Sequence, residues 1–411
     1  MTNPIQIHQY SNGLVLLAQR MDWLESAAFS LLLPAGCSRD PTPLLGLSNF
    51  TCEMVQRGCG ERDSRQFITD LENLGVDYSA SVANEHTAFA GALPADKLQQ
   101  ALPIFADLVQ QPHLPASQLE DARLACIQEI RALNDDLPQR AMLELRRRYY
   151  GDPFGRNSQG DLASVERICL EDIQHHVRTH YRPNDAILSA AGKIDFPRLR
   201  DQVGELFGDW ERRAPVTPTE NLSEPAPVHV PHESNQTHIA VAFPSVPYSD
   251  PGYYQARGAV GVLSDGMSSR LFTELREHRG LCYAAYAACH TVKHRGCVMC
   301  YAGTTTERAQ ETLDVLLAEL DKLKQGVQAD ELQRLKARLK SALIMQQESS
   351  ASRSGSIAAD WYYLSRAQTL EEVRRIVDGL TCDSINSHLS THPPADFLVV
   401  TLGQEPLEIP H

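Results

Sequence analysis

Hydrophobic and polar positions follow the same order twice along this chain. Residues 29–33 form an apolar run that ends at Pro34, and residues 239–243 form a similar run that ends at Pro244, 210 residues later. Short apolar runs that stop at a proline are typical of buried strands. The sequence therefore predicts a strand near the start of each half.

Three further pairs of segments repeat at nearly the same distance. They are marked by Leu119 and Leu332 (213 residues apart), Ile173 and Ile385 (212 apart), and Gly192 and Gly403 (211 apart). We interpret the four matches as an internal duplication. Each half is predicted to run through a strand, a helix, further strands, two or three long helices and a closing strand. This order favours the α+β class, with helices on one face of a mostly antiparallel sheet.

The join between the halves is rich in proline. We expect an N-terminal α+β half at residues 1–213, a linker at 214–232 and a C-terminal α+β half at 233–411. Five prolines make this linker a semi-rigid spacer. Two homologous halves on a stiff linker predict a clamshell with a cavity between them.

The composition limits the classes of partner and the cellular compartment that suit this chain. The net charge of −14 over 411 residues argues against nucleic acid and anionic membranes as partners. The first ten residues lack the pattern of a signal peptide, and no apolar run approaches the length of a membrane span. The ten cysteines are scattered, which fits buried thiols in the reducing cytoplasm.

A helix predicted at residues 47–54 carries Asn49, Cys52 and Glu53 beside its apolar stripe. Two histidines and a glutamate at those positions would form H-x-x-E-H, a zinc site with its general base. Here Asn49 is a poor ligand and the stretch contains no histidine. We therefore predict no metal site in this chain. We interpret Cys52 as inert packing, because no histidine is placed by motif to activate it.

Another pair of residues has metal-like spacing. His176 and His180 lie one turn apart on a predicted helix. No nearby carboxylate or thiol completes a site, so we interpret them as part of a solvated face.

These features resemble the pitrilysin or insulinase family of inverzincin metallopeptidases, in particular its mitochondrial-processing-peptidase-like branch, over essentially the whole chain. The family pattern reads Gly-Leu-Ala-His-Phe-Leu-Glu-His-Met, whereas this chain has Gly-Leu-Ser-Asn-Phe-Thr-Cys-Glu-Met. The resemblance implies that Asn49 and Glu53 replace the zinc histidines and Cys52 the general base. It also implies that Glu129 retains a distal ligand position. Ser79 stands where an asparagine often contacts substrate.

The second half matches the family more closely. The segment from Ser264 to Tyr283 resembles the signature of the C-terminal half, and Arg276 and Tyr283 match a pair that holds the substrate backbone. Residues 267–278 are predicted as a helix, Gly280 as its left-handed end, and Tyr283 as the opening of a strand. A guanidinium and a phenol that converge on one carbonyl would suit a developing oxyanion.

One lost motif and one retained motif lead to two hypotheses. In the first, the chain is the zinc-less subunit of a metallopeptidase. It would pair with a zinc-bearing homologue, which would hold the zinc, and would bind peptide through Arg276 and Tyr283. In the second, it is a catalytically dead homodimer or scaffold of the same fold that binds peptide or partners. The change at Ser79 favours the second hypothesis. In neither does the chain itself hold a cofactor or cleave peptides alone.

Overall fold

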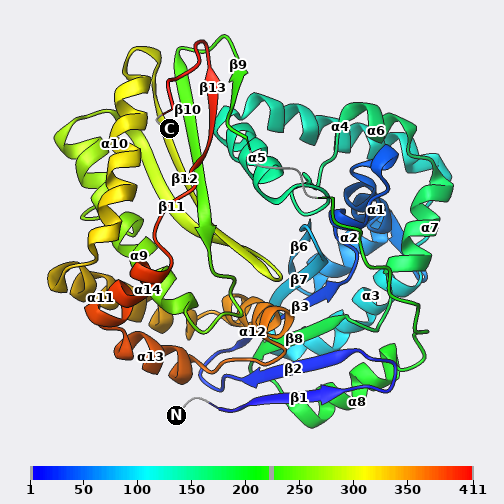
Figure 1. The fold of residues 1–411 in the computed structure, drawn as a ribbon. Helices are drawn as coiled ribbons and strands as arrows, with labels where there is room; N and C mark the ends of the chain where they lie inside the picture. The colour runs from blue at the N-terminus through cyan, green and yellow to red at the C-terminus, as the bar shows by residue number, and fades with distance from the viewer. Residues whose placement is uncertain (1–2, 222–225, 410–411) are drawn as a thin grey trace. The chain divides into compact units, whose positions relative to one another are not determined.

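The computed structural model describes residues 3–221 and 226–409, so residues 222–225 of the predicted linker lie outside the described residues. The chain divides into two compact units, neither of which is continuous in sequence. Unit 1 comprises Met1–Ala132, Arg156–Glu220 and Ile344–Glu371. Unit 2 comprises Leu133–Gly155, Asn221–Leu343 and Glu372–His411. Each unit is built around its own sheet (Figure 1).

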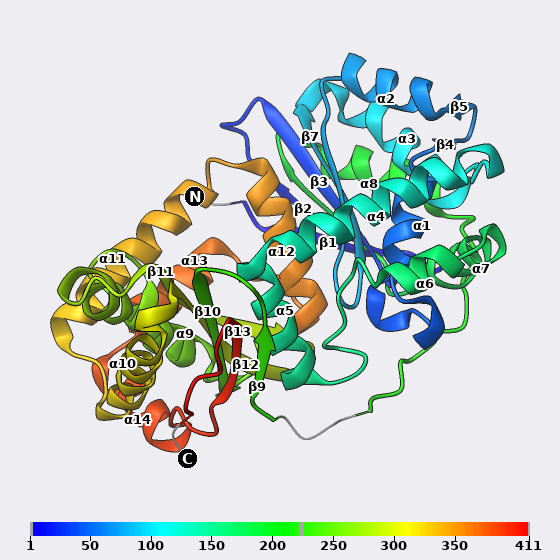
Figure 2. The ribbon, with the colours of Figure 1, turned by 90° about the horizontal axis from the view of Figure 1, so that it is seen from above.

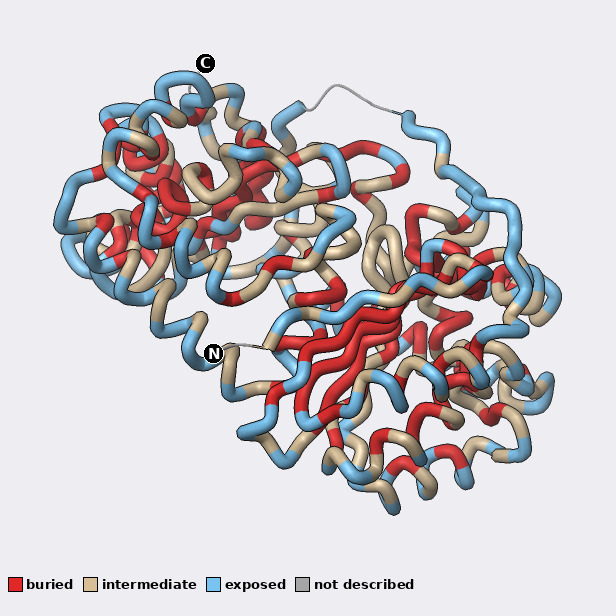
Figure 3. The backbone as a smooth tube through the Cα atoms, turned by 90° about the horizontal axis from the view of Figure 1, so that it is seen from below, coloured by how far each residue is buried: buried red, intermediate tan, exposed pale blue. Residues whose placement is uncertain are grey.

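The six strands of the unit 1 sheet lie in the order β1-β2-β8-β3-β7-β6. Their bounds are β1 Ile5–Gln9, β2 Val15–Arg20, β3 Ser26–Leu33, β6 Asp77–Val82, β7 Thr87–Pro94 and β8 Ile187–Gly192. Every neighbouring pair is antiparallel except β2 and β8. The central strands are buried almost throughout, as their apolar runs predict (Figure 3). A short separate hairpin is formed by β4 (Gly58–Cys59) and β5 (Arg62–Asp63).

The five strands of the unit 2 sheet lie in the order β11-β12-β10-β13-β9. Their bounds are β9 Val228–Pro231, β10 Gln236–Ser245, β11 Cys282–Val292, β12 Arg295–Thr305 and β13 Leu398–Gly403. Only β13 and β9 run parallel. Read from β9, this order repeats that of unit 1 from β2 onward. The predicted duplication and the α+β class with mostly antiparallel sheets are thus confirmed, while the clamshell stays a prediction.

Each unit has its own set of helices. In unit 1 they are α1 Leu47–Val55, α2 Ser64–Asn73, α3 Leu98–Gln110, α4 Leu119–Asp135, α6 Leu162–Arg167, α7 Leu170–His180 and α8 Phe196–Phe207. In unit 2 they are α9 Tyr253–Ser264, the π-helix η5 Phe272–His278, α10 Ala309–Lys322, α11 Ala329–Gln346, α13 Leu370–Gly379 and α14 Cys382–Thr391. Helices α1, α3 and α8 contact the unit 1 sheet, and α9, η5 and α10 contact the unit 2 sheet. The last residues of α4 fall in unit 2, and those of α11 in unit 1.

The opposite face of each sheet is covered by one helix from the other half of the sequence. Helix α12 (Ser350–Leu364) packs on β3 and β8 in unit 1. Helix α5 (Leu137–Tyr150) packs on β10 and β13 in unit 2 (Figure 2). The two helices begin 213 residues apart, the same spacing as the repeat. The duplicated halves have therefore exchanged equivalent helices.

Both exchanged helices are anchored by apolar and polar contacts. Ile357 of α12 is fully buried against Leu17 and its neighbours on the sheet. Beside it the Ser189 hydroxyl donates to the Ser354 carbonyl at 2.7 Å. In unit 2 the Tyr150 hydroxyl of α5 donates to the carbonyl of His290 on β11 at 3.1 Å.

Within residues 3–221 and 226–409, no helix combines the length and the apolar character needed to cross a membrane.

Candidate functional site

Helix α1 starts from a tightly defined turn. Gly46 has φ of 93°, which side-chain-bearing residues rarely adopt, and a Cβ there would lie 2.5 Å from the carbonyl oxygen of Gln159. The Asp40 carboxylate accepts hydrogen bonds from the backbone N–H groups of Gly46 and Ser48, each at 2.9 Å. Burial raises the pKa of Asp40 to about 6, opposed by the hydrogen bonds from Ser48. These contacts fix the direction of the side chains on the first turns of α1.

Asn49 and Glu129 are joined directly. The Nδ2 atom of Asn49 on α1 donates to Oε2 of Glu129 on α4 at 2.8 Å. The same nitrogen lies 4.0 Å from Sγ of Cys126, one turn before Glu129. An amide therefore links the two helices at the position where the resemblance places a zinc ligand.

Glu53 is directed to a different partner. Its carboxylate pairs with Arg57 one turn later on α1, and both side chains are about one quarter exposed. The i, i+4 spacing of the two residues is visible in the sequence and favours this ion pair over a metal-facing carboxylate.

Cys52 is sealed in the core of unit 1. Its exposed fraction is 4%. Burial raises the pKa of its thiol well above the ordinary value, and the Glu53 carboxylate adds to that effect. A thiol that stays neutral and inaccessible can serve neither as a nucleophile nor as a general base.

The side chains at the four motif positions do not fit a zinc ion. Zinc binds imidazole nitrogen, thiolate sulfur or carboxylate oxygen, with at least three protein ligands. Here Asn49 presents an N–H to Glu129, and Cys52 holds its proton. No group of three or more histidine, cysteine, aspartate and glutamate side chains within the described residues is arranged to hold a metal. No zinc chemistry is therefore assigned to this chain.

Ser79 lies on an open sheet edge. It belongs to β6, the last strand of the unit 1 sheet, and is exposed opposite Ala90 of β7. Helix α1 contacts the same strand. An exposed strand edge offers unpaired backbone groups to an extended peptide.

Arg276 and Tyr283 meet in unit 2. The Arg276 guanidinium carbon lies 4.9 Å from the ring centre of Tyr283 and 4.9 Å from that of Phe272. Tyr283 is 84% exposed. Within the described parts of the chain, no carboxylate lies within ion-pair distance of Arg276. Stacking fixes the plane of the guanidinium while its N–H donors stay available.

Two backbone irregularities bring Arg276 and Tyr283 into contact. Residues Phe272–His278 are wound as a π-helix, which ends before Gly280 at φ of 56°. The pairing of β11 with β12 then shifts register between Cys282 and Ala284, so Tyr283 is the extra residue of a β-bulge. Both irregularities recur at functional sites, where they redirect side chains.

The predicted helix at residues 267–278 was wrong at its start. Helix α9 ends at Ser264, and residues 267–269 form a turn closed by the Ser269 N–H to the Gly266 carbonyl at 3.2 Å. The helix begins at Arg270. The π winding could not be predicted, because seven residues are too few to separate its period from that of an α-helix.

The histidine prediction also needs correction. His176 and His180 are buried, with exposed fractions of 2% and 7% and ring centres 4.7 Å apart. Helix α7 turns this face toward the protein because it packs against α1. Burial lowers the pKa of both imidazoles, that of His180 to about 4.

The predicted site residues therefore form two groups. Asn49 and Glu129 are in contact in unit 1, near Cys52, while Glu53 is paired elsewhere and Ser79 lies on a strand edge. Arg276 and Tyr283 are in contact in unit 2.

Two profiles of one peptidase family match successive parts of the chain. The first, described as insulinase (peptidase family M16), matches residues 17–157. The second, described as the peptidase M16 inactive domain, matches residues 167–339. This chain belongs to the M16 family. The resemblance to pitrilysin and insulinase is thus confirmed, and assignment to the processing-peptidase-like branch stays a prediction.

Relatives of this M16 chain match nearly its whole length. An uncharacterized zinc protease of Rickettsia felis is 25% identical over 390 residues, covering 94% of each chain. The uncharacterized zinc protease YmxG of Bacillus subtilis is 22% identical, covering 98% of this chain and all of YmxG.

Solved structures share the fold. A peptidase M16 inactive domain from Pseudomonas fluorescens superposes with a TM-score of 0.90 at 23% identity, over 99% of this chain and all of the other. A protease from Helicobacter pylori superposes with a TM-score of 0.89 at 17% identity, over 98% of this chain and all of the other. At these identities the likeness establishes the M16 fold alone.

Proposed function

We propose that this M16 chain is the zinc-less subunit of a heteromeric metallopeptidase. It pairs with a zinc-bearing homologue, which supplies the metal, and contributes peptide-binding groups of its own. The observation that carries the proposal is the contrast between the two groups of residues. The amide of Asn49 closes the metal position against Glu129, whereas Arg276 and Tyr283 stay exposed and unpaired with any carboxylate in the described residues.

The proposed role of Arg276 and Tyr283 follows from their donors. The guanidinium offers several N–H groups in a rigid plane, and the phenol offers one O–H. A peptide carbonyl beside this pair would accept hydrogen bonds from both. The bonds would strengthen as negative charge develops on that oxygen during attack by water. These residues bind and polarise the substrate, and neither transfers a proton in this scheme.

The bound peptide is expected to be extended. The open edges of β6 and β11 offer backbone groups for strand addition. Ser79, on β6, is exposed and short, so it would contribute at most one hydroxyl contact to such a peptide. We place the assembly in the cytoplasm, because the ten cysteines are scattered along the chain and most are buried, which suits thiols in a reducing compartment.

A second function is favoured by Ser79 and the closed metal position together. In this alternative, two copies of the chain form a dimer that binds peptide or partner proteins without cleaving anything. The genome discriminates between the two. A neighbouring reading frame that encodes a homologue with intact H-x-x-E-H supports the heteromeric peptidase, and a genome that encodes no such homologue supports the homodimer or scaffold.

The direct test is reconstitution. The chain and its zinc-bearing homologue are purified separately, and cleavage of a quenched fluorescent peptide is measured for each and for the mixture. The proposal predicts chelator-sensitive cleavage only in the mixture, with about a hundredfold loss of kcat for Arg276→Ala. Arg279→Ala is the matched control, because Arg279 lies beside the pair and forms long ion pairs with Glu274 and Glu311 instead.

A further inference from the structure

The segment that carries Arg276 is held at both ends. Leu271 and Leu275 are fully buried in the unit 2 core, one turn apart, and fix one face of the helix. The burial of these two leucines does not decide whether the segment is wound as an α-helix or as a π-helix. Polar contacts from outside the segment meet it at Arg270 and again at residues 279–281.

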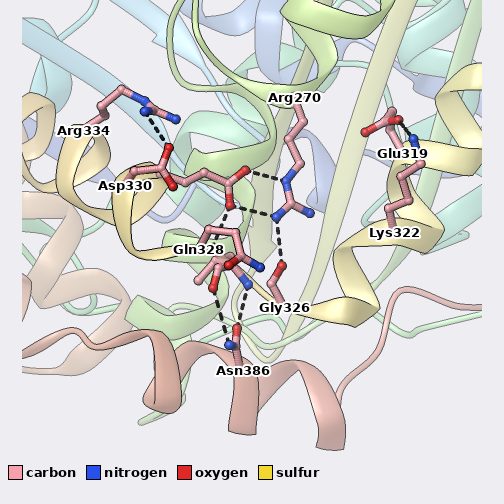
Figure 4. A network of polar contacts seen from close by, with 10 residues as sticks. Arg270, Glu319, Lys322, Gly326, Gln328, Asp330, Arg334 and Asn386 are labelled. Atoms are coloured by element: carbon pink, nitrogen blue, oxygen red, sulfur yellow. Dashed lines mark hydrogen bonds and ion pairs between the residues drawn. The ribbon is translucent and has the colours of Figure 1, made fainter.

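The contact at the start is a fork (Figure 4). Arg270 donates from Nε to Oε1 of Glu331 and from Nη2 to Oε2 of the same carboxylate, each at 2.8 Å. Its Nη2 also donates to the carbonyl of Gly326 at 2.8 Å. Both charged side chains are only 17% exposed, so solvent weakens this pair less than the surface pairs around it.

The groups that Arg270 contacts, Glu331 and the turn before α11, are themselves held in place by hydrogen bonds. Oε2 of Glu331 accepts the backbone N–H of Gln328 at 2.8 Å and so caps the start of α11. Asn386 on α14 accepts the backbone N–H of Val327 at 2.7 Å (Figure 4). Arg270 is therefore tied directly to α11 and, through the Gly326–Val327 turn, indirectly to α14. A cavity of about 340 Å³, lined by Arg270, Glu331 and Glu319 among others, borders this network.

The contacts at the end hold the backbone after the π-helix. Arg308 donates to the carbonyls of Gly280 and Arg279 at 2.7 and 2.8 Å. The Thr304 hydroxyl donates to the carbonyl of Leu281 at 2.6 Å. These bonds hold the backbone carbonyls of Arg279 to Leu281, the three residues just after the π-helix.

We infer that Arg270, through its fork to Glu331, is a positioning residue that keeps residues 272–278 in the π winding and thereby holds Arg276 over Tyr283. A π turn is a rare alternative to the α-helix and persists where surrounding contacts hold it. If the fork is lost, the segment can return to i→i+4 bonding, which rotates Arg276 away from the bulge at Tyr283. A lysine cannot replace the fork, because it presents a single ammonium group. The consequence for catalysis rests on the function proposed above.

The test has two arms, of which the first needs no activity. Hydrogen exchange of the isolated chain is followed by mass spectrometry over residues 270–284 in Arg270→Gln, Arg270→Lys and Glu331→Gln. The control is Arg334→Gln, which breaks an exposed i, i+4 pair with Asp330 one turn along α11 (Figure 4). We expect hydrogen exchange to be at least about tenfold faster in the first three variants and unchanged in the control. Unchanged exchange in Arg270→Gln and Arg270→Lys overturns the inference.

The second arm measures kcat and KM in the reconstituted complex. Arg270→Gln is expected to lower kcat about tenfold or more with a smaller change in KM, and to add nothing further in an Arg276→Ala background. A purely structural role would give additive losses, which would overturn the inference. If Arg276→Ala itself leaves kcat unchanged, the proposed function fails. The exchange arm then still decides whether Arg270 holds the helix, so the two failures are distinguishable.

Discussion

The amide of Asn49 on α1 donates to the carboxylate of Glu129 on α4 at 2.8 Å, which joins two residues 80 positions apart in sequence. This neutral donor occupies a position where the family pattern has a metal ligand. The bond therefore gives the helix pair a connection that needs no ion.

Asn49→Asp tests the importance of that donor. It replaces the N–H by a second carboxylate beside Glu129, so we expect the free energy of unfolding to fall by about 1–2 kcal/mol at neutral pH. The loss should shrink in acid, where the introduced carboxylate is protonated. Asn49→Ala is the control, because it removes the hydrogen bond without adding charge. Urea unfolding measures both, and an Asn49→Asp variant no less stable than Asn49→Ala would contradict this account.

The burial of Cys52 predicts selective thiol chemistry. Iodoacetamide at about pH 8 should label the exposed Cys169 and leave Cys52 unmodified until the chain is unfolded, because burial keeps the Cys52 thiol neutral and out of reach. Peptide mapping by mass spectrometry locates the label. Labelling of Cys52 in the folded chain at the rate of Cys169 would show that this part of the helix opens to solvent.

The exchanged helix α12 should contribute strongly to the stability of unit 1. Ile357→Ala empties a fully buried position against the sheet, and we expect a loss of about 3 kcal/mol in the free energy of unfolding. Ile344→Ala provides the comparison, since Ile344 is 60% exposed and its truncation should cost less than about 0.5 kcal/mol. Equal effects of the two substitutions would contradict the packing of α12 on β3 and β8.

His180 makes the stability depend on pH. Burial lowers its pKa from 6.5 to about 4, so the unfolded chain binds the proton more readily than the folded one. This contribution to stability is complete above pH 6.5 and is lost as the pH falls toward 4. The change is up to about 3 kcal/mol. His180→Gln should therefore lose less stability than the wild type between neutral pH and pH 4, as thermal unfolding would show. If the stability of the wild type and of His180→Gln fell equally between neutral pH and pH 4, the assignment of this pH dependence to His180 would be contradicted.

Some features could be predicted from the sequence because they depend on local patterns. The strand runs before Pro34 and Pro244 predict the two central strands, and the repeat predicts two sheets of the same order. The exchange of α5 and α12 could not be predicted, since an amphipathic helix does not reveal which sheet its apolar face will meet.

In the candidate site, too, some features could be predicted from the sequence and others could not. The family resemblance pointed to Arg276 and Tyr283, which do meet, but not to the π-helix and the bulge that bring them together. The Asn49–Glu129 bond and the Arg270–Glu331 fork join residues 80 and 61 positions apart. Such pairs depend on how the helices pack, which one sequence does not disclose.

The central claim is tested most directly by measuring zinc content and peptide cleavage for this chain, for its zinc-bearing homologue and for their mixture. The account predicts no stoichiometric zinc and no cleavage with this chain alone. In the mixture it predicts chelator-sensitive cleavage that falls about a hundredfold with Arg276→Ala in this chain. Chelator-sensitive cleavage by this chain alone, or full activity of the Arg276→Ala complex, would contradict it.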